Sequence, residues 1–253
     1  MITLSSDFGW PYPAAMRGVI AEQYEGRLID VSHQFPRGDI TTAAFWLREI
    51  LPYFPPAVHL AVIDPGVGTD RAVLAIKSDG HVLVGPDNGV LWPAACRLCD
   101  DPNPYVLTEV DADSATFHGR DVFAPLAASI ATKGIDSLVT AGLLASTDAP
   151  VTIDFPTADV SKTGATGTVL VIDCFGNVIT NIPGTIITEK MGQSVSINGR
   201  AVPVAPSYAH VGQGEALVTI GSHGNVELAE NDGRGTDAFS VTVGDTIELA
   251  FES

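Results

Sequence analysis

The feature that most constrains this 253-residue chain is a change of sequence pattern near Gly167. Before it, short apolar runs alternate with segments of helical spacing. After it, the helical signal fades, and short apolar runs follow one another between Gly, Asn and Asp residues. Alternating strands and helices are typical of a mostly parallel sheet flanked by helices, whereas closely spaced strands indicate a small antiparallel barrel or sandwich. The fold class is therefore α/β with a second, all-β part.

Hydrophobic periodicity predicts the individual elements. The expected strands of the first part are 2–5, 28–31, 58–63 and a hairpin of 72–76 with 82–84, and the expected helices are 14–24, 41–51 and 122–133. Asp39 or Thr41 is expected to cap the second helix, and Gly134 to end the third. The expected strands of the second part are 168–172, 178–181, 195–197, 216–220, 226–229, 239–241 and 246–251.

A polar stretch containing Pro and Gly, residues 154–164, separates the two patterns. Domain boundaries fall in such stretches, because few contacts cross them. We expect an N-terminal α/β domain at residues 1–155, a linker at 156–165 and a C-terminal antiparallel domain at 166–253.

The charge balance narrows the range of partners. Thirty acidic residues stand against thirteen basic ones, which gives a formal net charge of −17. Nucleic acid and anionic membrane surfaces are recognised by basic patches, so neither is an expected partner. Asp is twice as frequent as Glu, and Lys is scarce. An ordinary acidic enzyme and a protein of a salt-rich cytoplasm, where ions screen self-repulsion, both fit this composition.

The cysteines and the known cofactor motifs exclude further classes. An odd set of three cysteines, Cys96, Cys99 and Cys174, does not form a disulfide framework, and one C-x-x-C pair lacks the further ligands of a zinc site. Cys174 lies in an apolar run and is expected in the core. P-loop, G-x-G-x-x-G and G-x-S-x-G motifs are missing, which disfavours nucleoside triphosphates, NAD and α/β-hydrolase chemistry. We expect neither a metal nor an organic cofactor.

The sequence also bears on localisation. Its first residues lack a basic region followed by an apolar stretch, and no apolar run reaches about 18 residues. We therefore expect no signal peptide, no transmembrane helix and a cytoplasmic protein.

Polar residues gather where the strands of the first part end. Asp7, in S-D-F-G, follows the first strand, and Asp64, in V-I-D-P-G-V-G, follows strand 58–63. Ligands of open α/β sheets bind beyond the carboxyl ends of the strands. An Asp beside Gly is also a common turn residue, but two of them at strand ends favour a binding site.

A second group lies in T-F-H-G-R-D-V-F-A-P, at the entrance to the helix 122–133. His118 is suited to act as a base or a hydrogen-bond donor near neutral pH, although a single His at a helix start is often structural. Arg120 and Asp121 also fit a capping charge and its neighbour. Arg71 follows Asp64 by seven residues and is placed to pair with a carboxylate and favour its charged form. The motif G-P-D-N-G, residues 85–89, fits a turn better than a ligand role.

The densest motif of the second part is I-D-C-F-G-N-V-I-T-N-I, residues 172–182. A phenyl ring such as Phe175 stacks on a purine, an amide such as Asn177 reads the adenine edge, and a carboxylate such as Asp173 holds an ammonium group. A Gly-Asn hairpin turn with Phe175 in the core explains the same residues. Ser222 and Glu227, in G-S-H-G-N-V-E-L-A, follow a strand and also fit a turn.

Together these motifs resemble one family. The segments S-D-F-G, V-I-D-P-G-V-G-T-x-R, G-P-D-N-G, F-H-G-R-D-V-F-A-P and D-x-F-G-N-V-I-T-N-I occur in the order typical of the S-adenosyl-L-methionine (SAM) hydrolases, also called SAM hydroxide adenosyltransferases. These enzymes are related to the SAM-dependent fluorinases and chlorinases. The resemblance implies an N-terminal α/β domain, a C-terminal antiparallel β-barrel, and a homotrimer with active sites between subunits. It implies hydrolysis of SAM to adenosine and L-methionine, with some members preferring the (R)-sulfonium epimer.

The resemblance also assigns roles to residues. Asp64, Arg71 and His118 match the family's water-activating triad, and Asp7 matches the carboxylate that holds the ribose diol. The expected substrate-binding residues of the second part are Asn177 and Phe175 for adenine, Asp173 and Ser222 for the methionine amino-acid group, and Glu227 as a further candidate.

One departure and two alternatives accompany this assignment. Members usually read D-F-G-x-x-D-x-Y after the first strand, whereas Gly9 here leads directly into Trp10, so the loop is two residues short and lacks its second Asp. The methionine end and the epimer preference are expected to depend on this loop.

The alternatives are a SAM-dependent halogenase and a non-catalytic SAM or adenosine sensor. Halogenating relatives carry a non-acidic residue at the place of Asp64 and a hydroxyl residue at that of Gly119. Because an Asp repels a halide and a sensor needs no water activator, hydrolysis is favoured.

Overall fold

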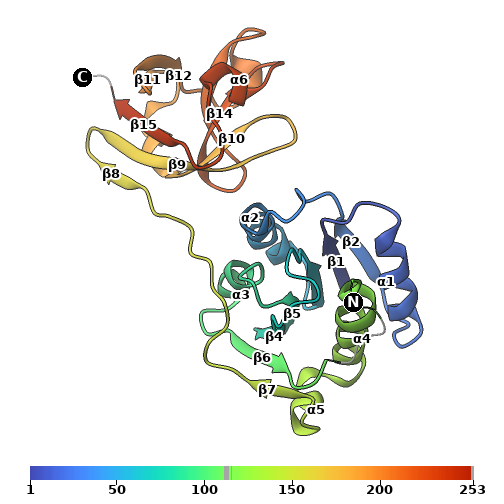
Figure 1. The fold of residues 1–253 in the computed structure, drawn as a ribbon. Helices are drawn as coiled ribbons and strands as arrows, with labels where there is room; N and C mark the ends of the chain where they lie inside the picture. Colours follow the sequence, from blue (N-terminus) through green and yellow to red (C-terminus); the bar gives the residue numbers. More distant parts are fainter. Residues whose placement is uncertain (111–113, 115, 252–253) are drawn as a thin grey trace. The chain divides into compact units, whose positions relative to one another are not determined.

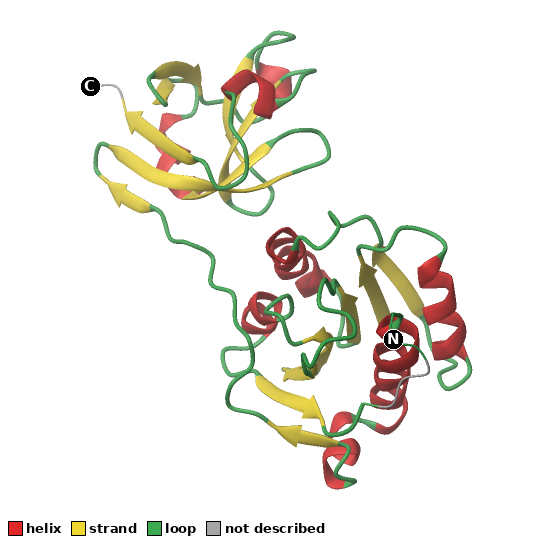
Figure 2. Ribbon diagram, in the orientation of Figure 1, coloured by secondary structure: helices red, strands yellow, loops and turns green. Residues whose placement is uncertain are grey.

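The computed structural model describes residues 1–110, 114 and 116–251, and it divides into two compact units, Met1–Asp154 and Phe155–Ser253. Figure 1 follows the chain through both units. Most helices belong to the first unit and strands dominate the second, as Figure 2 shows. The predicted fold class, an α/β part followed by an antiparallel barrel-like part, is confirmed.

A seven-stranded sheet organises the N-terminal unit, in the order β2-β1-β3-β5-β4-β6-β7. Its strands are β1 (Ile2–Ser6), β2 (Leu28–Ser32), β3 (Val58–Val62), β4 (Val73–Ser78), β5 (His81–Pro86), β6 (Asn103–Leu107) and β7 (Leu144–Ser146). The first four strands of this order pair in parallel, and β4, β6 and β7 extend the sheet by antiparallel pairing. The sheet is thus mixed, and β6 and β7 were not among the predicted strands.

Helices cover both faces of this sheet. Figure 1 shows α1 (Tyr12–Ala21) and α4 (Ala124–Lys133) on one face, and α2 (Ile40–Ile50) and α3 (Trp92–Leu98) on the other. Strands β1 and β3 are buried at every position, as expected for parallel strands that lie between two helical layers. The shorter elements of the unit are the 3₁₀ turn η1 (Leu51–Tyr53), the π-helical turn η2 (Gly119–Phe123) and α5 (Ile135–Thr140).

Local sequence signals explain several boundaries. The Asp39 side chain accepts a hydrogen bond from the Thr42 backbone N–H at 2.9 Å, which confirms one of the two predicted caps of α2. Strands β4 and β5 form the predicted hairpin, and its turn residues Asp79 and Gly80 both have positive φ. Gly134, with φ 81°, follows α4 at the predicted position.

The C-terminal unit is a nearly closed antiparallel barrel. Its strands are β8 (Asp159–Ser161), β9 (Gly164–Ile172), β10 (Val178–Pro183), β11 (Ser194–Ile197), β12 (Arg200–Pro203), β13 (Ala216–Ile220), β14 (Asn225–Glu230) and β15 (Thr246–Phe251). The order β12-β11-β15-β9-β10-β14-β13 is joined at its ends by a bridge between Val204 and Val218, and β8 pairs with β9. The 3₁₀ turns η3 (Gly184–Lys190) and η4 (Tyr208–His210) connect strands. Inward-facing Val, Ile and Leu residues fill its core.

Two local expectations for this part need revision. The predicted strand 239–241 is wrong, because the chain forms the short helix α6 (Gly235–Phe239) and then turns at Ser240, which has the left-handed φ of 54°. Strand β8 lies within the segment 156–165 that the sequence analysis treats as a linker. In the described part of the chain, every helix is too short or too polar to cross a membrane.

A buried pair of histidines lies in the N-terminal sheet. The Thr3 hydroxyl contacts His59 Nδ1 at 2.8 Å, and His59 Nε2 contacts His81 Nδ1 at 2.9 Å with the two rings stacked. Burial, reinforced by His81, lowers the pKa of His59 to about 3, and burial lowers the pKa of His81 as well. The pair is therefore held neutral in the folded protein.

This pair predicts acid sensitivity of the N-terminal unit. In the unfolded chain His59 takes up a proton below about pH 6.5, whereas in the folded protein it resists protonation down to about pH 3. The stability that this difference contributes is therefore fully present above about pH 6.5 and is lost as the pH falls toward 3. We expect the free energy of unfolding to fall by about 1.4 kcal/mol per pH unit from this group. Urea unfolding followed by Trp fluorescence reports this unit, since Trp10, Trp46 and Trp92 all belong to it.

The matched variant is His59→Gln, which does not titrate. The difference in unfolding free energy between the natural protein and this variant should shrink as the pH falls from 6.5 to 4. A difference that stays constant over that range contradicts the prediction. His210→Gln, which alters an exposed histidine of the other unit, is the control and should leave the pH dependence unchanged.

Candidate active site

The predicted site residues of the N-terminal unit, one for substrate binding and three for catalysis, lie beyond the carboxyl ends of its parallel strands. Asp7 follows β1 and Asp64 follows β3, and these two strands are neighbours in the sheet. Arg71 precedes β4, and His118 stands directly before η2. Asp64, Arg71 and His118 are in hydrogen-bond contact, although the chain separates the first and the last by 54 residues.

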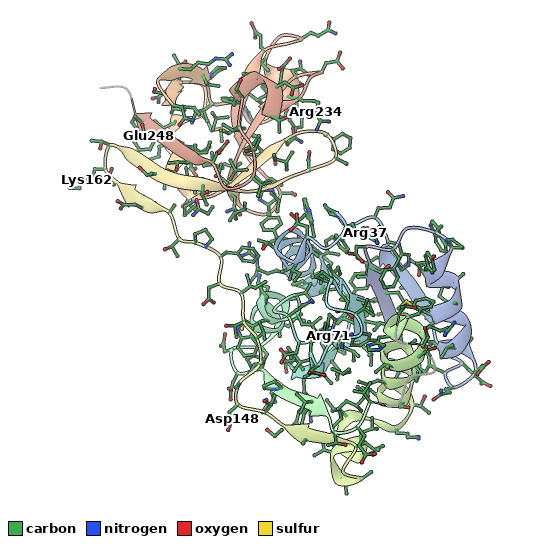
Figure 3. All side chains as sticks on the ribbon, viewed as in Figure 1. Arg37, Arg71, Asp148, Lys162, Arg234 and Glu248 are labelled. Carbon is green, nitrogen blue, oxygen red and sulfur yellow. The ribbon has the colours of Figure 1, made fainter. Side chains whose placement is uncertain are left out.

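Asp64 and Arg71 form a two-pronged ion pair. Arg71 Nε donates to Asp64 Oδ1 at 2.8 Å, and Arg71 Nη2 donates to Oδ2. Only 3% of the Asp64 side chain and 10% of the Arg71 side chain are exposed, and the guanidinium lies 4.9 Å from the centre of the Phe123 ring. Figure 3 labels Arg71 within this unit. Parallel guanidinium–carboxylate bonds fix both groups in one orientation, so the carboxylate has a defined direction.

The contact with Arg71 also sets the tautomer of His118. Arg71 Nη2 lies 3.1 Å from His118 Nδ1, and a guanidinium only donates, so Nδ1 accepts. The proton of a neutral imidazole is then on Nε2, which makes that atom a donor. His118 is buried at the start of a π-helical turn, a local geometry that often occurs at functional sites.

Arg120 and Asp121 do not belong to this cluster. They bond to each other through Nε and Oδ1, and the Arg120 guanidinium stacks over Phe117 at 5.1 Å. The Arg120 hydrogen bond holds the pKa of Asp121 below its usual range. Neither side chain caps the helix. They form an ion pair beside the site.

Asp7 anchors a neighbouring loop. Its Oδ2 accepts the backbone N–H of Gly38 at 2.7 Å. The shortened loop after it leads into α1, with Trp10 packed edge-on against His33 and Tyr12 edge-on against Phe117. Both Trp10 and Tyr12 remain exposed over more than half of their surface. Aromatic side chains thus border the polar cluster of this unit.

A cavity of about 810 Å³ lies in the C-terminal unit. Its lining includes all five residues that the sequence analysis proposed for this part, namely Asp173, Phe175, Asn177, Ser222 and Glu227. Phe175 is 73% exposed, so the alternative that it belongs to the core is wrong. Cys174, next to it, is also exposed, which corrects the expectation of a core residue, because the turn after β9 carries it out of the sheet.

Directed hydrogen bonds connect three of these side chains. Asn177 Nδ2 donates to Asp173 Oδ2 at 2.9 Å and to the Tyr208 hydroxyl at 3.2 Å, and that hydroxyl donates to Glu227 Oε1 at 2.7 Å. Since carboxylates only accept, the direction of each bond is fixed. Burial, together with the bond to Glu227, raises the pKa of Tyr208 above its usual range. Asn177 therefore uses both amide hydrogens inside the network and presents Oδ1 as an acceptor.

Asp173 and Tyr208 have roles that the sequence did not reveal. Asp173 Oδ1 accepts the backbone N–H groups of Phe175 and Asn177 at 2.9 and 2.8 Å, so the carboxylate also shapes the turn that presents them. Tyr208 precedes β13 in a polar loop, 31 residues from Asn177, and no spacing signal connects the two. Its position in the network is a consequence of the barrel.

Metal ligation finds no support in the described residues, among which no group of three or more His, Cys, Asp or Glu side chains is arranged to hold an ion. The cysteines of the C-x-x-C pair are both free thiols, with Cys96 exposed.

Fold and site together define a class of protein. A mixed α/β unit carries an Asp–Arg–His cluster beyond its parallel strands, and an antiparallel barrel carries a cavity lined by aromatic, amide and carboxylate side chains. Family models agree with both parts. The N-terminal domain of SAM hydroxide adenosyltransferase matches residues 2–139, and the C-terminal domain of the same family matches residues 167–248. The chain belongs to the SAM hydroxide adenosyltransferase family.

Individual relatives agree with this assignment. A protein of Salinispora tropica named (R)-S-adenosyl-L-methionine hydrolase is 39% identical over 255 residues, which cover 98% of this chain and 97% of that protein. A Thermus thermophilus protein of the same name is 37% identical over 258 residues, covering 96% and 97%. The crystal structure of an uncharacterized conserved protein from Thermotoga maritima is similar with a TM-score of 0.86 and 29% identity, covering 99% of this chain and 100% of that one. The resemblance found in the sequence is confirmed.

Proposed function

We propose that this chain is an enzyme that hydrolyses SAM to adenosine and L-methionine, with the (R)-sulfonium epimer as its preferred substrate. The observation that carries the proposal is the buried Asp64–Arg71–His118 cluster in a chain of this family. The epimer follows from the relatives, whose names specify it.

The reaction joins the oxygen of water to C5′ and breaks the bond between C5′ and sulfur. The sulfur keeps the bonding electron pair and leaves as the neutral thioether of methionine, so this leaving group needs no proton. One proton of the attacking water is released in the overall reaction. What the protein has to supply is therefore a water molecule held in line with C5′ and an acceptor for its proton.

Within this scheme Asp64 accepts the hydrogen of the water. Arg71 occupies one side of the carboxylate through both oxygens and leaves the remaining lone pairs for the water. His118 donates through Nε2 while Nδ1 is engaged by Arg71, so it orients the water or the product oxygen and is not the base. Burial of the ion pair strengthens these interactions by excluding solvent.

The other proposed residues hold the two ends of the substrate. Asp7 binds the ribose diol, Phe175 stacks on the adenine ring, and the free acceptor Oδ1 of Asn177 suits the 6-amino group. Asp173, Ser222 and Glu227 are proposed for the amino-acid group of methionine, because carboxylates attract its ammonium and a hydroxyl suits its carboxylate.

We further propose a homotrimer in which each active site combines the N-terminal unit of one subunit with the C-terminal unit of its neighbour. The polar clusters are divided between the two units, and each is bordered by exposed aromatic side chains: Trp10 and Tyr12 in the first, Phe175 and Tyr208 in the second. Exposed apolar rings of this kind are typical of surfaces that become covered.

The activity is tested by incubating the purified protein with SAM of mixed sulfonium configuration, at low and at molar KCl, and separating the products by HPLC. We expect adenosine and methionine in equal amounts, with the (S)-epimer left over. The chloride in the same assay tests the halogenase alternative, which requires a 5′-chloro-nucleoside product. SAM that binds but remains intact in both salts supports the sensor and contradicts the proposal. Activity only at molar KCl indicates adaptation to salt.

The role of Asp64 is tested by Asp64→Asn. The amide no longer accepts the proton of the water, so we expect the rate of hydrolysis to fall about 10²- to 10⁴-fold. Adenosine binding, measured by calorimetry, should stay within a few-fold, because the nucleoside is held by other residues. A variant with undiminished turnover contradicts the assignment of Asp64.

The shared site is tested by complementation. Asp64→Asn impairs the N-terminal half of the site, and Asn177→Ala impairs the C-terminal half. In trimers assembled from equal amounts of both variants, about one site in four combines two intact halves, so we expect about a quarter of the natural activity. If both halves of each site came from the same subunit, the mixture would recover no activity. Light scattering on the same samples measures the number of subunits directly.

A further inference from the structure

The motif G-P-D-N-G, residues 85–89, forms the turn at the end of β5 and requires glycine at both of its ends. A Cβ on Gly85 would lie 2.3 Å from the carbonyl oxygen of Ala61, so only glycine allows β5 to approach β3 this closely. Gly89 has φ of 93°, and a Cβ there would lie 2.5 Å from the Ile153 side chain. Gly85 thus brings the start of the turn against β3, and Gly89 lets its end pass close to Ile153.

This turn contacts the backbone on both sides of the Asp64–Arg71 ion pair. Asn88 Nδ2 donates to the carbonyl oxygen of Ile63, the residue before Asp64, at 2.8 Å. The backbone N–H of Asp87 donates to the carbonyl oxygen of Ala72, the residue after Arg71, at 3.0 Å. One short turn thus fixes the two chain segments from which the ion pair projects.

The segment that the turn closes has little support of its own. Pro65 and residues 67–70 are exposed. Within this loop the Val67 N–H makes a long bond of 3.4 Å to the Asp64 carbonyl oxygen, and Thr69 donates to the Gly66 carbonyl oxygen through both its N–H and its hydroxyl. The direction of the Asp64 carboxylate therefore depends on the backbone at Ile63 and Ala72. The orientation of Asn88 is unambiguous, because its Oδ1 accepts from the Val90 N–H at 3.2 Å while Nδ2 faces a carbonyl.

We propose that Asn88 is a positioning residue, which aligns Asp64 and Arg71 for attack by the water through its bond to the Ile63 carbonyl, together with the Asp87 N–H. The inference rests on the proposed function of Asp64. Asn88 acts through the backbone and does not touch the reacting atoms in this role. Because displacements of about 1 Å in a catalytic group are sufficient to slow a reaction 10²-fold, loss of this bond should reduce turnover.

The sharpest variant is Asn88→Asp, which keeps the acceptor for Val90 and loses the donor to Ile63. We expect kcat for SAM hydrolysis to fall about 10- to 100-fold, while KM and the affinity for adenosine change less than about threefold. Asn103→Asp is the matched control, since Asn103 also donates through Nδ2 to a backbone carbonyl, that of Asp101, and lies on the surface. It should retain the natural kcat.

A double-mutant cycle separates positioning from general destabilisation. If Asn88 acts through Asp64, adding Asn88→Asp to Asp64→Asn should cause less than a twofold further loss. Full additivity overturns the proposal. Equal losses of kcat, adenosine affinity and thermal stability in Asn88→Asp also overturn it, since they indicate a structural role alone. If this variant does not fold, Asn88→Ala carries the same measurements and the same criteria.

The outcomes also distinguish this proposal from the proposed function. If the natural protein hydrolyses SAM, Asp64→Asn is inactive and Asn88→Asp keeps the natural kcat, the proposed function stands and the positioning role of Asn88 is overturned. Natural protein without hydrolysis overturns both. A selective loss of kcat in Asn88→Asp, absent from Asn103→Asp, supports the positioning role.

Discussion

The ion pair between Asp64 and Arg71 is the interaction on which the rest of the candidate site depends. Two nearly buried charges are stable there because each satisfies the other in a two-pronged arrangement. Arg71 then uses Nη2 a second time, toward His118, and so determines which nitrogen of that ring carries a proton. The orientation of three groups thus follows from one guanidinium, and that guanidinium is held against the face of Phe123.

The placement of this pair follows from the architecture of the N-terminal unit. β3 ends at the edge where ligands of parallel sheets bind, and Asp64 follows it directly. β5 lies beside β3 and β4 beside β5, so the turn after β5 reaches both the residue before Asp64 and the residue after Arg71. The antiparallel return of β4 is what allows a single turn to contact both ends of the intervening loop. A purely parallel sheet would place the residue after Arg71 at the opposite edge.

In the C-terminal unit, neutral side chains connect two carboxylates by hydrogen bonds. Asp173 and Glu227 are carboxylates of one cavity, and Asn177 and Tyr208 connect them by a chain of hydrogen bonds that has one direction. The donors in this chain of hydrogen bonds are neutral, and the second oxygen of Glu227, Oε2, lies 3.6 Å from His223 Nε2. The chain of hydrogen bonds also leaves one acceptor, Oδ1 of Asn177, whose chemistry matches an amino group of a ligand. The large exposed ring of Phe175 lines the same cavity.

Local patterns predicted much of the fold and many residues of the candidate site. Apolar periodicity gave most strands of both units and α2, and turn chemistry gave the β4–β5 hairpin and the Asp39 cap, because these depend on neighbours in sequence. The expected strand at 239–241 failed, since a short apolar run does not distinguish a strand from the last turn of a helix. β6 was not predicted; its Pro104 disfavours a strand, and antiparallel pairing with β4 and β7 stabilises it.

The sequence by itself determined the two-part architecture, the family, and the presence of Asp7 and Asp64 at strand ends. These follow from periodicity, from turn residues and from five motifs in order, all of which are properties of short segments. Only the tertiary structure decided that Arg71 contacts His118 across 47 positions, that Tyr208 joins Asn177 to Glu227, and that Asn88 holds the Ile63 carbonyl. Such contacts depend on which strands become neighbours, and that is set by long-range packing of the core.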